Sequence, residues 1–584
     1  MERRVLLAIF LAFLVLYVWQ AVFVKPVPKP LPGTKAGNAA ATTTAAGDAR
    51  SGAQQPGEGA SSAVTRQPTP GGPVAAPLVA DTSERDVRVE TEYVVAVFTN
   101  RGARLKSWRL KRYLDQRRQP QELVESQIGS QPLPFTLRMT NEAMTATLND
   151  ALYTVAGAPA GTAASSSPID VRFEYRDDAG VHAVKEFHLD SASYVITFRA
   201  TITEGDRPLT PAIVWGPAVG DTGEQSRYVK KAEGIVFENG KVVRAAPKDI
   251  AQQPVHDGDF RYAGVDDNYF MTVALEPGSS KVVFQPVTIP PPGDSKEPPR
   301  ELVAFSLEPQ LAGAPVKFFA GPKDFDVLAA IDRDLSRAVD FGMFAVIVVP
   351  LLRSLKWVNG YVGNYGWSII ILTFIINAIL FPLRHKSVVS MRKMQEIQPE
   401  VKAIQERYSK LKATDPAKQK MNQEMMALYK ERGVNPASGC VPMLMTMPFI
   451  FAFYALLSTA IELRGAPFIG WIHDLSAHDS YFVTPILMGL SQIWQQRLTP
   501  AAGVDPVQQK MMMLMPVFFT FLFLWYPSGV ALYWLVNNIW AIGQQYLTNY
   551  LIGPPDVRAA RSSAGERRMK RVGGGKTDAA ARDD

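Results

Sequence analysis

The apolar residues of this 584-residue chain are concentrated in its first 24 residues and in a stretch from about 341 to 552. Both regions contain runs long enough to cross a bilayer, whose hydrocarbon core is about 30 Å thick. We expect six membrane spans, and these are Val5–Val24, Tyr365–Leu383, Val441–Ile461, Tyr481–Trp494, Met511–Tyr526 and Ser528–Tyr550. The pattern therefore predicts a multi-domain membrane protein with an α-helical membrane bundle.

The first apolar run is best explained as an N-terminal membrane anchor, residues 1–25. It follows Arg3 and Arg4, and Lys25 and Pro26 stand where a signal peptidase would need small residues. A cleavable signal peptide is the competing interpretation. The basic flank predicts a cytoplasmic N-terminus.

The next two segments differ from the anchor and from each other in composition. Residues 26–80 are rich in Pro, Ala, Gly, Thr and Ser, which predicts a disordered linker. Residues 81–325 contain short runs that alternate between apolar and polar positions, such as Val87–Thr99 and Tyr194–Thr203. A period of two is typical of strands, so this segment predicts an antiparallel β-sandwich, or super-sandwich.

The remaining segments predict helices in the membrane and beside it. Residues 326–362 include an apolar run that Pro350, Arg353 and Lys356 interrupt, which favours an amphipathic helix at the membrane interface over a span. A core of five spans follows at 363–552.

Basic residues predict the orientation of the spans. The loop between the second and third spans, residues 384–439, carries 12 Lys and Arg against 6 Asp and Glu, and the tail 553–584 carries 8 against 5. In the loop 463–480, Arg464 is the only Lys or Arg residue. By the positive-inside rule, both chain termini are cytoplasmic and the β domain is exported.

The cytoplasmic segment 387–432 carries two methionine-bearing stripes at helical spacing, which predicts a helical hairpin. The stripes comprise Met391, Met394, Ile397, Val401 and Ile404 in the first helix, and Met421, Met425 and Leu428 in the second. Either the two stripes pack on one another, or the adaptable methionines receive unfolded hydrophobic segments.

Polar side chains within the spans are costly and usually face a bundle interior or a wet cavity. Thr373 and Asn377 lie four residues apart on one helical face, and Asn537 shares a face with Gln544. Interhelical hydrogen bonds and a hydrophilic groove both remain open as explanations.

Searches for catalytic and metal-binding patterns exclude several classes of protein. The single cysteine, Cys440, cannot form an intramolecular disulfide, and the six histidines show no metal-ligand spacing. The tail segment Gly573–Thr577 lacks the first glycine of a phosphate-binding loop and has no strand before it. We expect no enzyme activity, no metal, no cofactor and no small-molecule substrate.

Long strings of residues resemble the YidC family of membrane protein insertases from Gram-negative inner membranes. They are WSIIILTF (367–374), SMRKMQEIQPE (390–400), QEMMALYKERGVNPASGCVPMLMTMPFIFAFYALL (423–457), ELRGAPFIGWIHDLSAHDSYFVTPILMG (462–489), DPVQQKMMMLMPVFFTFLFLWYPSG (505–529) and LYWLVNN (532–538). The exported domain resembles that family's periplasmic domain through AGVDDNYFMTVAL (263–275) and FAGPK (319–323).

The resemblance implies an insertase whose five-span core encloses a hydrophilic groove, open to the cytoplasm and the lipid but closed toward the periplasm. The polar part of an incoming chain enters the groove, and its apolar segment moves into lipid along the second and sixth spans. It also implies an inner-membrane location and, as partners, nascent membrane proteins, membrane lipids, the Sec translocon (SecYEG and SecDF) and, through the basic tail, ribosomes.

The resemblance also assigns residues to the groove. Thr373, Tyr533 and Trp534 correspond to its substrate side, as does the position of Asn377, and the hairpin with Met391, Met394, Met421 and Met425 corresponds to the part that receives substrate. We add Asn537 to the expected groove because it is a polar residue within the last span. Most family members carry an arginine where this chain has Asn377. Arg384, further along the same span, is the candidate substitute for that charge.

Two other functions compete with the insertase hypothesis. A small-solute transporter or channel is the alternative for the spans, although no internal repeat with matching broken helices is found. A sugar-binding or sugar-processing domain on an anchor is the alternative for the β segment, but it leaves five spans without a role.

Overall fold

A computed structural model describes residues 76–115, 117–125, 131–157, 165–218, 231–289, 299–408, 417–433, 441–498 and 506–552. All of them belong to one compact unit, Pro73–Asp584. The predicted anchor 1–25, most of the predicted linker 26–80 and the tail 553–584 lie outside the described residues.

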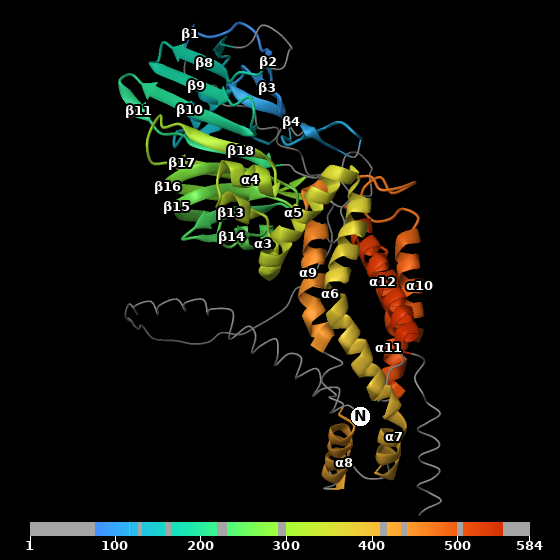
Figure 1. Ribbon diagram of the computed structural model, residues 1–584. Coiled ribbons are helices and arrows are strands. Elements are labelled where there is room, and N and C mark those ends of the chain that lie inside the picture. Colours follow the sequence, from blue (N-terminus) through green and yellow to red (C-terminus); the bar gives the residue numbers. More distant parts are fainter. Residues whose placement is uncertain are drawn as a thin grey trace, which may run out of the picture. The chain divides into compact units, whose positions relative to one another are not determined.

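The first half of the described chain forms two antiparallel β-sheets (Figure 1). The larger sheet contains β1 (Pro77–Val79), β6 (Thr136–Arg138), β7 (Thr154–Ala156), β8 (Ile169–Asp177), β9 (Val181–Leu189), β10 (Val195–Glu204), β11 (Arg207–Leu209), β12 (Ala212–Ala218), β13 (Glu233–Glu238), β14 (Lys241–Ala245), β15 (Val255–Asp266), β16 (Phe270–Ile289), β17 (Arg300–Pro309) and β18 (Val316–Pro322). The smaller sheet contains β2 (Asp86–Glu90), β3 (Val94–Thr99), β4 (Arg104–Leu114) and β5 (Pro120–Glu122). The prediction of antiparallel sheets is confirmed.

Alternation of side chains explains the individual strands. In β8, residues with even spacing are buried and those between them are exposed or half-buried, as the period of two requires. The alternating run Val87–Thr99 forms a hairpin of β2 and β3. The backbone N–H of Thr91 donates to the carbonyl of Val94, 2.8 Å away, and this turn reverses the chain.

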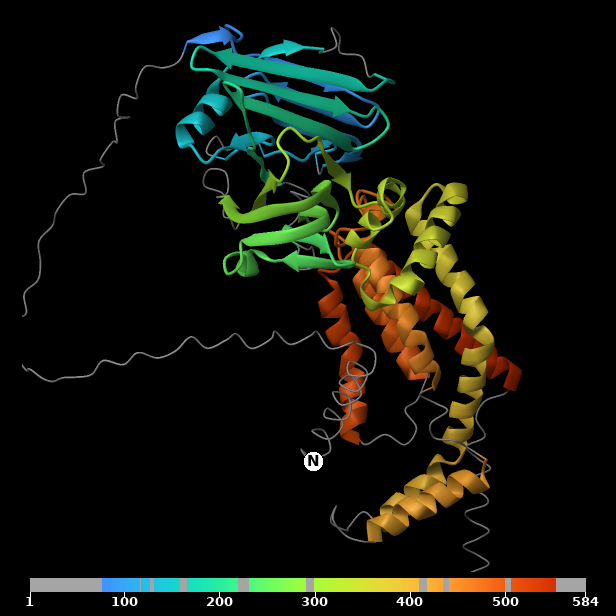
Figure 2. The same cartoon turned by 90° about the vertical axis from the view of Figure 1, so that its left-hand side faces the viewer.

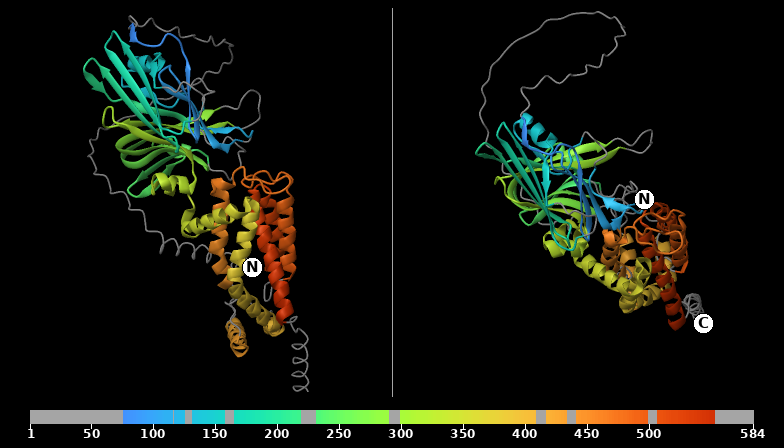
Figure 3. Two further views of the ribbon diagram at one scale, coloured as in Figure 1. Left: turned by 45° about the horizontal axis from the view of Figure 1, so that its top comes forward. Right: turned by 90° about the horizontal axis from the view of Figure 1, so that it is seen from above.

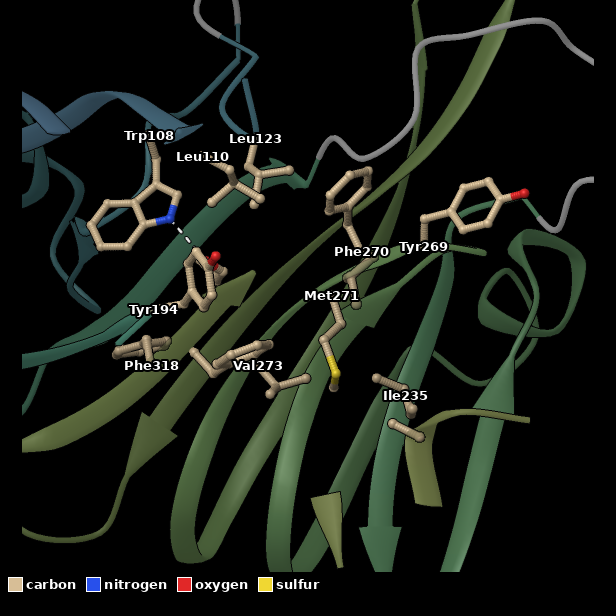
Figure 4. Packing of buried hydrophobic residues seen from close by; sticks show 14 of the residues in the cluster. Trp108, Leu110, Leu123, Tyr194, Ile235, Tyr269, Phe270, Met271, Val273 and Phe318 are labelled. Carbon is tan, nitrogen blue, oxygen red and sulfur yellow. Dashed lines mark hydrogen bonds between the residues drawn. The ribbon is translucent and has the colours of Figure 1, made fainter. Parts of the chain in front are cut away.

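The core of the β domain lies between the two sheets. Phe98 of β3 packs on Phe187 of β9, with ring centroids 4.8 Å apart. The indole N–H of Trp108 on β4 donates to the carbonyl of Ala320 on β18 at 2.8 Å, close to Tyr194 (Figure 4). The smaller sheet therefore packs against the larger one through large aromatic residues, which bury the most apolar surface per side chain.

Short helices flank the sheets, and long ones form the second half of the chain. The short ones are α2 (Glu142–Asp150), α3 (Pro247–Ile250) and α4 (Phe325–Ile331). The long ones are α5 (Ala345–Val362), α6 (Tyr365–Glu396), α9 (Val441–Thr459), α10 (Val483–Leu498), α11 (Pro506–Phe523) and α12 (Ser528–Ile552), and α7 (Gln398–Arg407) and α8 (Ala417–Glu431) form a separate pair (Figure 2). Figure 3 shows α6, α9, α10 and α12 side by side.

Two described helices are long and apolar enough to cross a membrane, Gly342–Val362 and Tyr365–Lys386. The first coincides with the helix that we expect at the interface, so its interfacial placement stays a prediction. Met447–Thr459 and Met513–Phe523 are apolar but shorter. The count of six spans therefore also stays a prediction.

Helix α6 is longer than its predicted span, which was expected to end at Leu383. It continues through Pro382 to Glu396 and so includes the start of the predicted hairpin. The break comes at Ile397, and Pro399 occupies the first turn of α7. Proline is tolerated there because the first-turn N–H has no intrahelical partner.

Candidate functional site

A small cavity lies among the helices where α6, α9 and α12 meet. It has a free volume of about 10 Å³, roughly the space of one water molecule. Its lining consists of Thr373, Ile376, Asn377, Leu380 and Arg384 from α6, Phe449, Ile450 and Phe453 from α9, and Tyr533 and Asn537 from α12. The structure therefore brings together five of the six residues that were assigned to the groove or to its charge.

The helical repeat places the lining residues of α6 on one face. Thr373, Asn377, Leu380 and Arg384 follow one another at intervals of four, three and four residues. The Thr373 hydroxyl donates to the carbonyl of Ile369 at 2.6 Å, and the Asn377 amide donates to the carbonyl of Thr373 at 2.8 Å. Both donors are thus satisfied within their own helix.

The side-chain oxygen of Asn377, unlike the two donors, has no hydrogen-bond partner among the described residues. Asn377 is only 3% exposed. An unsatisfied buried acceptor costs about 1–3 kcal/mol. The cavity wall therefore holds a buried acceptor that no donor of the described residues satisfies.

Adjacent residues of α12 face in different directions. The ring of Tyr533 stacks on Phe453 of α9, with centroids 4.5 Å apart, and lines the cavity. Trp534 instead stacks on Phe519 of α11 at 6.0 Å and does not line the cavity. Residues next to each other on a helix point about 100° apart, and here this turns Trp534 toward α11 while Tyr533 faces α9.

Arg384 is the cationic residue of the cavity lining. Its side chain is half-buried, and no carboxylate lies within 4.0 Å of it in the part of the chain that the structure describes. Arginine is always charged in proteins. A half-buried guanidinium without a carboxylate partner among the described residues gives the described cavity lining a net positive charge.

The methionine stripes pack on one another in α7 and α8. Ile397, Val401, Ile404 and Leu428 are buried between the two helices, and Met394, Met421 and Met425 are half-buried against them. The side chain of Met391 lies outside the described residues. The packing alternative thus accounts for the observed state, and it leaves Met426, which is 60% exposed, as an exposed methionine of the pair.

A separate polar cluster joins the β domain to the helices. The guanidinium of Arg464 donates to the carbonyl of Leu114 at 2.7 Å and to the side-chain oxygen of Gln121 at 2.8 Å. It also lies 5.0 Å from the ring centroid of Phe270. The amide of Asn268 donates to the carbonyl of Ser458 on α9 at 3.3 Å.

A lysine of α5 completes this junction. Lys356 Nζ lies 2.6 Å from Asp326, 3.5 Å from Asp324 and 3.1 Å from Glu462. Glu462 follows the end of α9 and pairs with Lys356 here. Burial raises the pKa of Glu462, and the charge of Lys356 opposes that rise.

Sequence reasoning missed the aromatic wall of the cavity and the junction. Phe449 and Phe453 carry no polar signal, so nothing local marks them as lining residues. Leu380 could have been found, because it lies on the same helical face as Asn377 and Arg384. The hydrogen-bond partners Leu114 and Gln121 are 350 and 343 positions away from Arg464 in the sequence.

Comparison with known proteins gives a consistent result. Residues 357–553 match the family model described as 60Kd inner membrane protein, and residues 86–354 match the YidC periplasmic domain. The chain is 34% identical to the membrane protein insertase YidC of Pelobacter propionicus, over 94% of this chain and all of that protein. It is also 34% identical to the YidC of Geotalea daltonii, over 94% of this chain and 99% of that one.

One solved structure covers most of the chain. It is a crystal structure of an active YidC insertase with its first transmembrane domain resolved, and it is 19% identical with a TM-score of 0.33. The alignment covers 82% of this chain and 95% of that one.

Proposed function

Because this chain belongs to the YidC family of membrane protein insertases, we propose that it inserts nascent membrane proteins into the inner membrane and assists their folding. The sequence match covers nearly the whole length of relatives that are named membrane protein insertases. These relatives are insertases rather than enzymes. The comparisons give no support to the alternative of a small-solute transporter or channel.

The observation that carries the proposed mechanism is that the half-buried Arg384 and the unsatisfied oxygen of Asn377 belong to one cavity lining. The guanidinium attracts an acidic group on the incoming chain, and the amide oxygen accepts a hydrogen bond from its backbone. Both interactions replace hydration that the polar segment loses, which otherwise costs several kcal/mol per group.

The cavity is too small to hold a peptide, so substrate has to widen it. The aromatic pair of Phe453 and Tyr533 then separates, and α6 moves from α12. The apolar segment of the substrate leaves into lipid along these two helices. Burial of about 20 apolar residues, at roughly 25 cal/mol per Å², drives this transfer without a nucleotide.

The remaining features extend this proposal. Six spans place both termini in the cytoplasm and the β domain in the periplasm, with α5 at the outer interface. The α7–α8 hairpin receives substrate first, starting at the exposed Met426. The basic tail contacts ribosomes, the spans contact membrane lipids, and the protein works alone or beside the Sec translocon.

Site-specific photocrosslinking to a ribosome-bound nascent membrane protein tests the proposal. A crosslinker at Thr373 or Asn377 is expected to capture the substrate once its apolar segment has emerged. Trp534 is a matched control on the same bundle, because it faces α11, and it should crosslink much less. Absence of crosslinks, with insertion unchanged when the protein is depleted, would refute the insertase function.

A further inference from the structure

The loop 464–482, between α9 and α10, contacts the first turns of three helices, and we call it the strap. Within the strap, the N–H of Phe468 donates to the carbonyl of Ile472 at 2.9 Å, and the N–H of Leu475 donates to the carbonyl of Ala466 at 3.0 Å. These bonds give the loop a defined shape, although it contains no regular element.

The strap holds the start of α6 through Phe468. The amide of Asn364 donates to the carbonyl of Phe468 at 3.0 Å, and the ring of Trp367 meets the Phe468 ring edge-on at 5.6 Å. A Cβ atom at Gly366 would lie 2.1 Å from the Phe468 ring. The glycine therefore permits an approach that any other residue would prevent.

The strap also holds the start of α12 through its backbone carbonyls. The N–H of Ser528 donates to Ala477 at 2.7 Å, and the N–H of Gly529 donates to Leu475 at 2.9 Å. The Ser528 hydroxyl donates to the carbonyl of Asp474 at 3.1 Å. First-turn N–H groups of a helix have no intrahelical partner, and here the strap satisfies two of them.

The first turn of α10 is bonded to the strap as well. Asp479 accepts hydrogen bonds from the backbone N–H and the hydroxyl of Thr484, both at 2.8 Å, and from the indole N–H of Trp471 at 2.8 Å. Helices α6, α10 and α12 thus all begin at one hydrogen-bonded loop.

The opposite halves of the same three helices differ. Each carries a buried polar atom without a hydrogen-bond partner in the described chain. These atoms are His385 Nδ1 on α6, Gln492 Oε1 on α10, and Gln544 Nε2 and Thr548 Oγ1 on α12, whereas Asn377 Oδ1 and Trp540 Nε1 lie nearer the middle of their helices. Separation of these halves would let water or substrate satisfy such atoms, whereas separation at the strap would break bonds that exist.

We propose that the strap is a pivot that positions the two walls of the cavity, so that α6 and α12 part at their C-terminal halves while their first turns stay together. The positioning residues are Phe468 in the strap and Ser528 at the start of α12. The partner that enters the widening end is the polar flank of a nascent membrane protein, so the inference rests on the proposed function. The pivot sets how far the walls part and where the opening begins.

Distances between paired spin labels in the full-length protein test the pivot, with Cys440→Ser as background. One pair is placed near the strap, at Ile371 and Trp525, and the other at Ile379 and Tyr550. All four side chains are exposed. Loading with a ribosome-bound nascent membrane protein should lengthen the second distance by about 5 Å or more, the width of one extended chain, and leave the first unchanged.

Substitutions that weaken contacts with the strap should allow the first pair of labels to move when substrate is loaded. Phe468→Ala is expected to broaden the Ile371–Trp525 distance on loading. Asn364→Ala, which removes one hydrogen bond to the strap and one from the backbone N–H of Trp367, should broaden it less. Ile469→Ala is the matched control, because that neighbouring side chain is 56% exposed. Equal lengthening of both pairs in the background chain, or no effect of either variant, would overturn the pivot.

The outcomes separate the two proposals. Insertion that proceeds while both pairs lengthen refutes the pivot and leaves the insertase function intact. Absence of both insertion and movement in the background chain refutes the insertase function itself.

Discussion

At the scale of single residues, the charge of the cavity lies at a different position from the one that the resemblance implies. The resemblance assigns a groove arginine to the position of Asn377, and the structure places Arg384 on the same cavity two helical turns further along α6. An arginine side chain is long enough for its guanidinium to reach back along the helix. Residue type at one position therefore does not decide whether the cavity is charged.

Replacement of Arg384 by alanine should reduce insertion of substrates with an acidic flank by about tenfold or more, since a desolvated charge pair contributes at least about 1.5 kcal/mol. Arg384→Lys should keep much of the activity, because it preserves the charge. Insertion into membrane vesicles is the measurement. Lys386→Ala is the control, because Lys386 is exposed at the end of the span and does not line the cavity.

Lys185 is a second residue whose environment defines its role. It is fully buried in the β domain, and its Nζ donates to the carbonyls of Gly102 at 2.6 Å and Phe135 at 2.9 Å. Lys185→Met should destabilise the β domain by about 2 kcal/mol, because these carbonyls lose their donor. Denaturant unfolding of the full-length protein measures this, with the exposed Lys317→Met as control.

The same lysine predicts a pH dependence of stability. Burial holds the pKa of Lys185 well below its ordinary value. Between that lowered pKa and the unfolded value of about 10.4, the unfolded chain binds the additional proton, so stability should rise as the pH rises. Lys185→Met should abolish this rise, and a slope that persists in the variant would contradict the assignment.

At the scale of elements, α5 is the helix whose position sequence and composition leave open. It is apolar enough to span, yet its exposed face carries Val346 and Trp357 about 11 residues apart. If α5 lies at the outer interface, cysteines at both positions should react with an impermeant thiol reagent added from the periplasmic side. A span would leave one of the two unreactive, which contradicts the interfacial placement.

In the α7–α8 hairpin, the packing of the two helices decides whether the methionine stripes are free to bind a partner. The stripe that includes Met421 and Met425 would suit an adaptable binding face, but it packs against Ile404 of α7. Sequence periodicity predicts each helix, because it depends on neighbours within one turn. It does not predict which surface a stripe covers, because that depends on contacts between helices.

At the scale of the whole molecule, Arg464 connects the helices to both sheets of the β domain. Its partners lie on the end of β4, in β5 and on β16. Arg464→Ala should loosen the β domain, and limited proteolysis of the full chain in membranes should then cut between the domains faster. Arg333→Ala, at an exposed position, is the control. An unchanged cleavage rate in Arg464→Ala would show that the other junction contacts suffice.

Two of the sequence strings that resemble the family lie where the β domain meets the helices. The strings 263–275 and 319–323 are far apart in sequence, but Lys323 pairs with Asp266 at 2.7 Å and donates to the carbonyl of Asp267. Asn268, in the first string, bonds to α9. Both strings thus lie at the junction with the helices.

The sequence by itself determined what depends on near neighbours: antiparallel strands from alternation, the helices from their apolar runs, and a polar face from Thr373 to Arg384 on one helix. Only the tertiary structure decided which of these surfaces meet. It separated Tyr533 from Trp534, paired the methionine stripes, and gave Arg464 a partner 350 positions away. Local periodicity records the direction of a side chain relative to its own element, whereas contacts between elements depend on packing of the whole chain.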